Sequence, residues 1–168
     1  MFRAYLGLGA NLGDPRAQMA RAVAVLASTP GVRVSAVSSL YGSRPEGGLD
    51  QPDYANAVVS LDTDLLEREL FALGQRLEVL AGRTAGERNA SRELDVDLLL
   101  YEDRVWDQAD LVLPHPRMES RAFVLVPLAE IAPEARHPVS GKTAQVMAAE
   151  VSHEGLWCLA AGSGWMQG

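Results

Sequence analysis

Cysteine and long apolar runs are both scarce in this chain of 168 residues. The single cysteine, Cys158, excludes an internal disulfide, and a small buried residue is its simplest role. No apolar run approaches the length that crosses a membrane. The N-terminus lacks the charged and then apolar pattern of a signal peptide. We therefore expect a soluble, cytoplasmic protein with no membrane partner.

Positive charge is also scarce, since the formal net charge is −7 and the pI is near 4.9. Such a balance argues against a protein that binds a nucleic-acid backbone. Only one of the fifteen basic residues is lysine, and six arginines fall between Arg83 and Arg121. Guanidinium groups bind phosphate oxygens in a bidentate manner, so this cluster favours a small polyphosphate ligand over a polymer.

The chain has no repeats, no linker and no low-complexity segment, and 48% of it is hydrophobic. We expect one domain over residues 1–168, with a core at roughly 3–133 and a C-terminal extension at 134–168. Periodicity predicts strand, helix, strand, strand, helix and strand in this order: 3–9, 15–28, 32–41, 54–61, 66–80 and 94–101. The fold class is therefore α+β, with a ferredoxin-like βαββαβ core, an antiparallel sheet and long active-site loops.

Local signals refine these elements. Asp14 is the expected N-cap of the first helix, and Asp64 and Glu67 have the spacing of a capping box before the second. Five leucines give the second helix its apolar stripe: Leu66, Leu70, Leu73, Leu77 and Leu80. Val105-Trp106 is expected to pair back in a hairpin. Helices are expected near 121–130 and 140–151, a strand at 156–159, and a flexible tail at 162–168.

Asp95 and Asp97 are the most informative pair. Side chains two apart on a strand point to one face, so both carboxylates leave the same side of the sheet. Like charges held there are costly, and a divalent cation such as Mg²⁺, which prefers carboxylate and phosphate oxygens, removes the cost. The competing interpretation is the solvent face of an amphipathic strand.

The residues around this pair have two interpretations each. Arg83, Arg88 and Arg92 lie either in a solvated loop or in a lid that folds onto phosphates. His115, fixed between two prolines, is either structural or, together with Arg121, a donor to phosphate oxygens.

A second group of residues is compatible with a heterocyclic ligand. Tyr54 and Asn56 share a strand face, and with Phe123 they suggest an aromatic slot with an amide, or else core aromatics and a turn asparagine. Gln75 and Glu78 share a helix face, for which a solvated surface is the simpler interpretation. Gly7, Gly9 and Gly13 are one residue too widely spaced for a dinucleotide fingerprint, so we interpret them as a tight turn in which Asn11 bonds its backbone.

Four blocks together resemble the 6-hydroxymethyl-7,8-dihydropterin pyrophosphokinases of folate biosynthesis, in order and in spacing, between residues 5 and 133. The blocks are Gly9-Ala10-Asn11-Leu12-Gly13, residues 50–57 (DQPDYANA), residues 92–100 (RELDVDLLL) and residues 113–128 (from LPHP to RAFVLVPL). The resemblance implies transfer of pyrophosphate from ATP to the pterin by a monomer with a ferredoxin-like core.

The resemblance also implies site residues. Asp95 and Asp97 would hold two Mg²⁺ ions and, with Arg83 and Arg92, form the catalytic set. The implied ATP-binding residues are Gln75, Glu78, Arg83, Arg88, Arg92, Leu98, His115 and Arg121. The implied pterin-binding residues are Ser43 (through its backbone), Pro45, Tyr54, Asn56, Asp95 and Phe123.

The sequence departs from the family pattern in the loop before Arg92. Asn89-Ala90-Ser91 stands where Trp-Gly-Pro is common, and Glu46 stands where an apolar pocket residue is common. The alternative function is therefore a catalytically impaired ferredoxin-like module that binds nucleotide or pterin.

Overall fold

The computed structural model describes residues 1–45, 50–82 and 94–167. Within this part of the chain, the main sheet is antiparallel, with the order β5-β1-β4-β3-β8 and with β2 also paired to β4. Its strands are β1 (Phe2–Ala10), β2 (Val32–Val37), β3 (Leu40–Ser43), β4 (Tyr54–Thr63), β5 (Asp95–Tyr101) and β8 (Leu156–Ala160). The neighbours of β1 are β4 and β5, as in a ferredoxin-like core, so the predicted fold class is confirmed.

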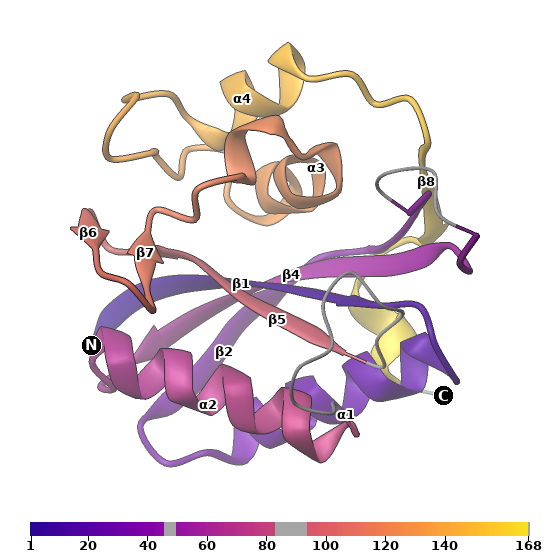
Figure 1. Ribbon diagram of the computed structural model, residues 1–168, viewed down its shortest axis with the longest axis horizontal. Coiled ribbons are helices and arrows are strands. Elements are labelled where there is room, and N and C mark those ends of the chain that lie inside the picture. Colours follow the sequence, from indigo (N-terminus) through magenta and orange to yellow (C-terminus); the bar gives the residue numbers. More distant parts are fainter. Residues whose placement is uncertain (46–49, 83–93, 168) are drawn as a thin grey trace.

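Helices cover both faces of the sheet (Figure 1). One face carries α1 (Pro15–Ser28) and α2 (Glu67–Leu80), and the other carries α3 (Ala122–Ile131) and α4 (Ala144–Glu150). Alternation along β1 creates the two cores: Ala4, Leu6, Leu8 and Ala10 are buried towards α1 and α2, whereas Tyr5 packs towards α3 and α4. Among the described residues, no helix has the length and apolar character needed to span a membrane.

The helix α1 begins as predicted. The Asp14 carboxylate accepts a hydrogen bond from the Ala17 N–H at 3.1 Å, and Met19, Val23 and Leu26 are buried.

The start of α2 was predicted incorrectly. The helix begins at Glu67, and the N–H of Leu66 before it donates to the Glu69 carboxylate at 2.8 Å, so Asp64 and Glu67 form no capping box. Leu66 and Leu80 are exposed because they stand at the two ends of the helix, outside the stripe of Leu70, Leu73 and Leu77.

The strand predicted over residues 32–41 is broken into β2 and β3 at Ser38 and Ser39. The Ser38 hydroxyl accepts the N–H of Val58 at 2.9 Å, in place of a backbone carbonyl. The N–H of Ser39 donates to the Glu130 carboxylate of α3 at 3.0 Å. The Ser38 N–H still donates to the Val58 carbonyl at 3.0 Å, so side chains replace only part of the ladder here, and pairing with β4 continues from Tyr41.

Trp106 lies in a hairpin, but its partner is further along the chain. The strand β6 (Trp106–Asp107) pairs with β7 (Val112–Leu113) in a separate two-stranded sheet. Leu111 and Leu113 of this hairpin are buried in the core beneath α1 and α2.

The C-terminal segment packs back on the fold, so the expected flexible tail is wrong as far as Gln167. A short 3₁₀ helix, η3 (Ser163–Met166), buries Trp165 to 5% exposure. The Trp165 indole N–H donates to the Ser38 carbonyl at 2.9 Å, and the Arg16 guanidinium donates to the Trp165 carbonyl at 2.7 Å. Cys158 is exposed rather than buried, because it lies on the edge strand β8.

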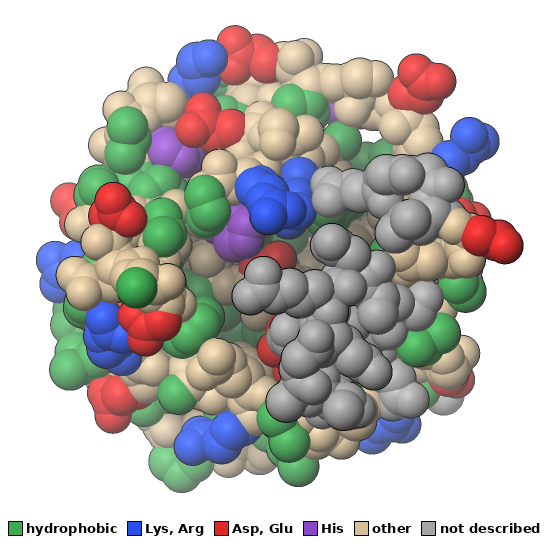
Figure 2. Space-filling view, viewed as in Figure 1, with side chains coloured by type: hydrophobic (Ala, Val, Ile, Leu, Met, Phe, Trp, Pro, Cys, Tyr) green, Lys and Arg blue, Asp and Glu red, His purple; other side chains and the backbone are tan. Residues whose placement is uncertain are grey.

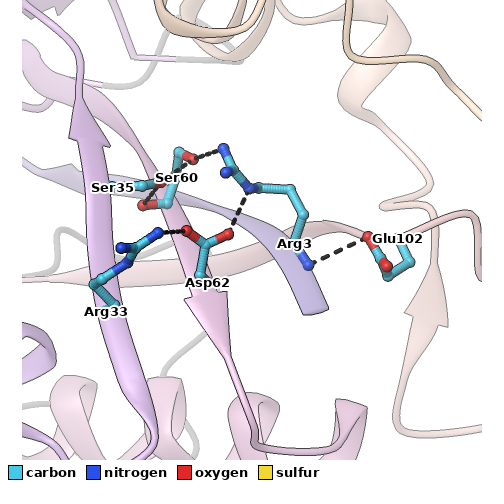
Figure 3. Close-up of polar contacts among 6 residues, drawn as sticks. All are labelled: Arg3, Arg33, Ser35, Ser60, Asp62 and Glu102. Carbon is cyan, nitrogen blue, oxygen red and sulfur yellow. Dashed lines mark hydrogen bonds and ion pairs between the residues drawn. The ribbon is translucent and has the colours of Figure 1, made fainter. Parts of the chain in front are cut away.

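An ion-pair network joins three strands at the start of β1 (Figure 3). The Asp62 carboxylate accepts from the Arg33 guanidinium at 2.6 Å and from the Arg3 guanidinium at 2.9 Å, and these contacts lower the Asp62 pKa, the Arg33 hydrogen bond most strongly. Arg3 also donates to the Ser60 hydroxyl at 2.9 Å. The network ties β1, β2 and β4 together at the end of β1 remote from Gly9.

Candidate active site

Asp95 and Asp97 project from the same face of β5. Asp95 lies opposite Gly9 of β1, and Asp97 lies opposite Gly7. Both aspartates are partly exposed, whereas Val96 between them is buried in the core beneath α1 and α2. The predicted common face is therefore confirmed, and it is the face that α3 and α4 cover elsewhere.

Gly9 has no side chain, so the backbone beside this pair is uncovered, and we call this surface the Gly9 floor. Gly9 pairs with Asp95 on one side and with Asn56 of β4 on the other, so these two polar side chains stand about 10 Å apart across one strand. A Cβ added to Gly9 would lie 3.4 Å from the Asn56 side-chain oxygen. This role of Gly9 was not predicted, because the spacing of Gly7, Gly9 and Gly13 indicated a turn. The spacing of two between Gly7 and Gly9 inside a strand was the available signal.

Asn56 is buried and its amide is oriented. Its Nδ2 group donates to the Ser43 hydroxyl at 2.8 Å and approaches the Tyr41 carbonyl at 3.5 Å. The assigned orientation turns the amide oxygen towards the space above Gly9. Ser43 thus acts here through its hydroxyl, which the family resemblance had not implied.

Tyr54 borders the same region, since a Cβ added to Gly9 would lie 4.0 Å from one carbon of its ring. Tyr54 is two residues before Asn56 on the same strand face and is partly exposed, as is Pro45 after the end of β3. The Asn11 amide donates to the Gln51 side chain at 3.0 Å and to the Pro52 carbonyl at 3.1 Å. Asn11 therefore fixes the approach to β4, a longer-range role than the predicted turn.

His115 stands next to Asp97. Its backbone N–H donates to the Leu99 carbonyl at 2.9 Å, and its Nε2 atom lies 3.8 Å from Asp97 Oδ2. Burial, followed by the charges of Arg121 and Arg117, lowers the His115 pKa to about 4. His115 is therefore neutral near pH 7, and its approach to Asp97 is not an ion pair.

The tautomer of His115 follows from its other nitrogen. The Nδ1 atom accepts the N–H of Arg117 at 3.2 Å, so the proton of the neutral ring is on Nε2. A fixed N–H donor is thus presented beside the Asp97 carboxylate.

Arg121 and Phe123 complete this end of the site. Arg121 follows the 3₁₀ helix η2 (Met118–Ser120) and precedes α3, and its guanidinium carbon lies 5.3 Å from the centre of the Phe123 ring. After burial, the positive charge of Arg121 is the next largest cause of the lowered His115 pKa. Figure 2 shows basic, histidine and acidic side chains gathered near the centre of the face that carries β5 in Figure 1.

A cavity of about 220 Å³ opens beside Asp97 and His115, between α2, β5 and the β6–β7 hairpin. Leu98, implied as an ATP-binding residue, lines it. The other lining residues are Phe71, Val96, Ala109, Asp110, Leu111, Val112 and Pro116.

Gln75 and Glu78 have different surroundings. Gln75 is exposed, but Glu78 is buried, so the predicted solvated face is wrong for Glu78. The Glu78 carboxylate accepts the N–H of Val96 at 2.9 Å. Because β5 is an edge strand, this N–H is available to a side chain, and Glu78 thereby holds the strand between Asp95 and Asp97.

Several predicted residues fall outside the described ranges. Arg83, Arg88 and Arg92 do so, as do Glu46 and Asn89-Ala90-Ser91.

Asp95 and Asp97 suit a hard divalent cation that arrives with a phosphorylated ligand. The Asp97 side chain is 41% exposed, and glycines replace side chains opposite both carboxylates. Within residues 1–45, 50–82 and 94–167, no group of three or more histidine, cysteine, aspartate or glutamate side chains could hold a metal. Two carboxylates that leave the remaining positions to water and phosphate oxygens match the usual coordination of Mg²⁺.

The chain is similar to known proteins over most of its length. Residues 5–133 match the family model described as 7,8-dihydro-6-hydroxymethylpterin-pyrophosphokinase (HPPK). A 2-amino-4-hydroxy-6-hydroxymethyldihydropteridine pyrophosphokinase of Methylorubrum extorquens is 44% identical over 93% of this chain and 98% of that protein. A protein with the same name from Pseudomonas aeruginosa is 41% identical over 88% of this chain and 91% of its own length.

A solved structure has the same fold. The wild-type HPPK-DHPS of Plasmodium falciparum matches with a TM-score of 0.70 over 89% of this chain, at 13% identity, and this chain spans 44% of that longer one. The match to the family model and the identity to the bacterial relatives lead to one conclusion: this chain belongs to the 7,8-dihydro-6-hydroxymethylpterin-pyrophosphokinase family.

Proposed function

We propose that this chain transfers pyrophosphate from ATP to 6-hydroxymethyl-7,8-dihydropterin, giving AMP and the pterin diphosphate in folate biosynthesis. The observation that carries the proposal is the pair of aspartates on β5, which lies beside Gly9, with Asn56 on the other side of that glycine. This arrangement occurs in a chain that belongs to the pyrophosphokinase family.

In this reaction the pterin hydroxymethyl oxygen attacks the β-phosphorus of ATP, and AMP leaves. Phosphoryl transfer of this kind depends on positioning and on neutralisation of charge rather than on a covalent intermediate. Asp95 and Asp97 would hold Mg²⁺, and we propose two ions. When bound, the cations neutralise phosphate oxygens and activate the attacking oxygen.

The pterin is proposed to lie over Gly9. The amide oxygen of Asn56 faces that space and accepts hydrogen bonds from the heterocycle, while Asp95 borders it on the other side. Tyr54 and Phe123 supply aromatic surface, and Ser43 and Pro45 close the β3 end.

The ATP is proposed to place its base in the cavity lined by Leu98, because adenine is a flat, uncharged ring. The Nε2–H of His115 and the guanidinium of Arg121 then donate to phosphate oxygens. The proposal extends this role to Arg83, Arg88 and Arg92. Gln75 is proposed to lie beside the nucleotide, and Glu78 acts through β5.

The remaining expectations are proposals as well. We propose a cytoplasmic monomer with one domain over residues 1–168. The packing of β8 and η3 against the core supports a single cooperative unit. Sedimentation velocity tests the monomer, and a single unfolding transition by calorimetry tests the domain.

The experiment is to measure AMP release from ATP and Mg²⁺, with and without 6-hydroxymethyl-7,8-dihydropterin. The proposal predicts AMP in proportion to the pterin consumed, and none without the pterin. Nucleotide binding without AMP release would instead support the alternative, an impaired binding module.

A further inference from the structure

The indole ring of Trp157, on β8, lies directly on the backbone of Gly42 in β3. A Cβ added to Gly42 would lie 2.3–2.6 Å from three atoms of that ring, a separation that real Cβ atoms do not show. Gly42 does not have the positive φ that would require glycine for its backbone conformation. The close approach of Trp157 is therefore the reason that only glycine fits at this position.

This contact lies behind the proposed pterin-binding face, on the other side of β3. In the β3–β8 ladder, Trp157 is opposite Gly42 and Leu156 is opposite Ser43. The N–H of Arg44 extends the ladder by donating to the Gly155 carbonyl at 3.2 Å. By alternation, Trp157 covers the back of β3, while the Ser43 side chain points to the opposite face, where it accepts the hydrogen bond from Asn56.

The strand β3 depends on this support because it is short. It contains four residues, and its pairing with β4 covers only Tyr41, Gly42 and Ser43. The strand ends at Ser43, and past it the Arg44 N–H is bonded on the β8 side, to Gly155. The position of the Ser43 hydroxyl, and hence the orientation of the buried Asn56 amide, therefore rests on β4 from one side and on β8 with Trp157 from the other.

Trp157 lies outside the two hydrophobic cores of the fold. It is 37% exposed and belongs to neither core cluster of the described residues. The far end of β8 is anchored independently, since the N–H of Gly162 donates to the Ser39 hydroxyl at 2.8 Å and Trp165 is buried.

We propose that Trp157 is a positioning residue for the pterin: its ring, held against Gly42, fixes the end of β3 and so keeps Ser43 and Asn56 in the geometry that recognises the heterocycle. The inference rests on the proposed function, because it assigns Asn56 to pterin recognition. The C-terminal strand is thereby part of the substrate site, although it carries no residue that touches the reacting atoms.

The test compares Trp157→Ala with a matched control, Leu159→Ala. Leu159 lies on the same strand and is 51% exposed. The three atoms nearest to a Cβ added to Gly42 all belong to Trp157 and none to Leu159. Steady-state AMP release should show the KM for the pterin raised about tenfold in Trp157→Ala, with kcat and the KM for ATP within about twofold of the wild type. Leu159→Ala should match the wild type, and Trp157→Phe should restore most of the pterin affinity.

A second pair of variants tests the contact itself. Gly42→Ala should raise the pterin KM in the wild-type background but add little to Trp157→Ala, because the clash requires the indole. If Trp157→Ala does not fold, the pterin KM values of Gly42→Ala and Trp157→Phe are compared with that of the wild type instead. An unchanged pterin KM in both Trp157→Ala and Gly42→Ala, or an equal loss in kcat and in both KM values, would overturn the inference.

Failure of the proposed function has a different signature, since the wild type itself would then release no AMP. In that case the dissociation constant of 6-hydroxymethyl-7,8-dihydropterin, measured by calorimetry with a non-hydrolysable ATP analogue, replaces KM in the same comparison. Weaker binding in Trp157→Ala than in Leu159→Ala supports the positioning role, and equal binding refutes it.

Discussion

Asp95 of β5 lies directly opposite Gly9 of β1 in the antiparallel ladder. The absence of a side chain at Gly9 leaves the carboxylate beside an open stretch of backbone, with Asn56 on its far side. A flat ligand that lies on this backbone would reach the amide and the carboxylate together. The site therefore depends on a glycine as much as on its charged residues.

Substitution of Gly9 tests this floor. Gly9→Val should reduce kcat/KM for the pterin by about 10- to 100-fold, because the new side chain occupies the space in front of the Asn56 oxygen. Gly164→Ala is the control, since a Cβ added there meets no atom within 4 Å. Steady-state assays and thermal unfolding measure both variants. Full activity in Gly9→Val would exclude the floor as the pterin site.

The lowered His115 pKa predicts a pH effect on the stability of the metal-free protein. The folded value is about 4 and the ordinary value is 6.5, so the unfolded chain binds the proton more readily as the pH falls. The stability that neutral His115 contributes is present above pH 6.5 and is lost as the pH falls towards 4.

Urea unfolding in the presence of a chelator measures this effect. From pH 7 to pH 5, the wild type should lose about 1 kcal/mol more unfolding free energy than His115→Gln, a figure reduced for partial solvent screening. Parallel pH profiles for the two proteins would show that His115 is not held neutral.

Arg68 connects α2 to the hairpin that lines the cavity. Its guanidinium donates to the Asp110 carboxylate at 2.7 Å, and its central carbon lies 5.3 Å from the centre of the Trp106 ring. Because Asp110 lines the cavity, Arg68→Ala should raise the KM for ATP about two- to fivefold and leave the KM for the pterin unchanged.

The charge-swapped pair, Arg68→Asp with Asp110→Arg, is the control for this link. It should recover part of the ATP affinity that either single change removes. Equal changes in both KM values would indicate a general loss of stability instead.

The order of the core elements could be predicted because it depends on local signals. The N-cap at Asp14 and the leucines at 70, 73 and 77 predict the helices from residues close in sequence, without knowledge of the tertiary packing. The break at Ser38 and Ser39 could not be predicted, because it depends on Val58 and Glu130, which are distant in sequence. The packing of Trp165 against Ser38 was missed for the same reason.

The features of the site likewise divide into those that local sequence predicts and those that depend on residues distant in sequence. The common face of Asp95 and Asp97 follows from the period of a strand, so the sequence was sufficient. The burial of Glu78 was not predictable from its helix alone, because its partner is the edge N–H of Val96. The floor at Gly9 becomes visible only when β4 and β5 are placed on either side of β1.

The central claim is that the two β5 carboxylates hold the cations that make pyrophosphoryl transfer possible. The most direct measurement is the Mg²⁺ dependence of AMP release by the wild type, Asp95→Asn and Asp97→Asn, with Asp103→Asn, an exposed residue after the end of β5, as an acidic control. The account predicts Mg²⁺-dependent turnover in the wild type and the control, and a loss on the order of a thousandfold in both β5 variants at every Mg²⁺ concentration. Near-normal turnover in either β5 variant, with an unchanged Mg²⁺ requirement, would contradict it.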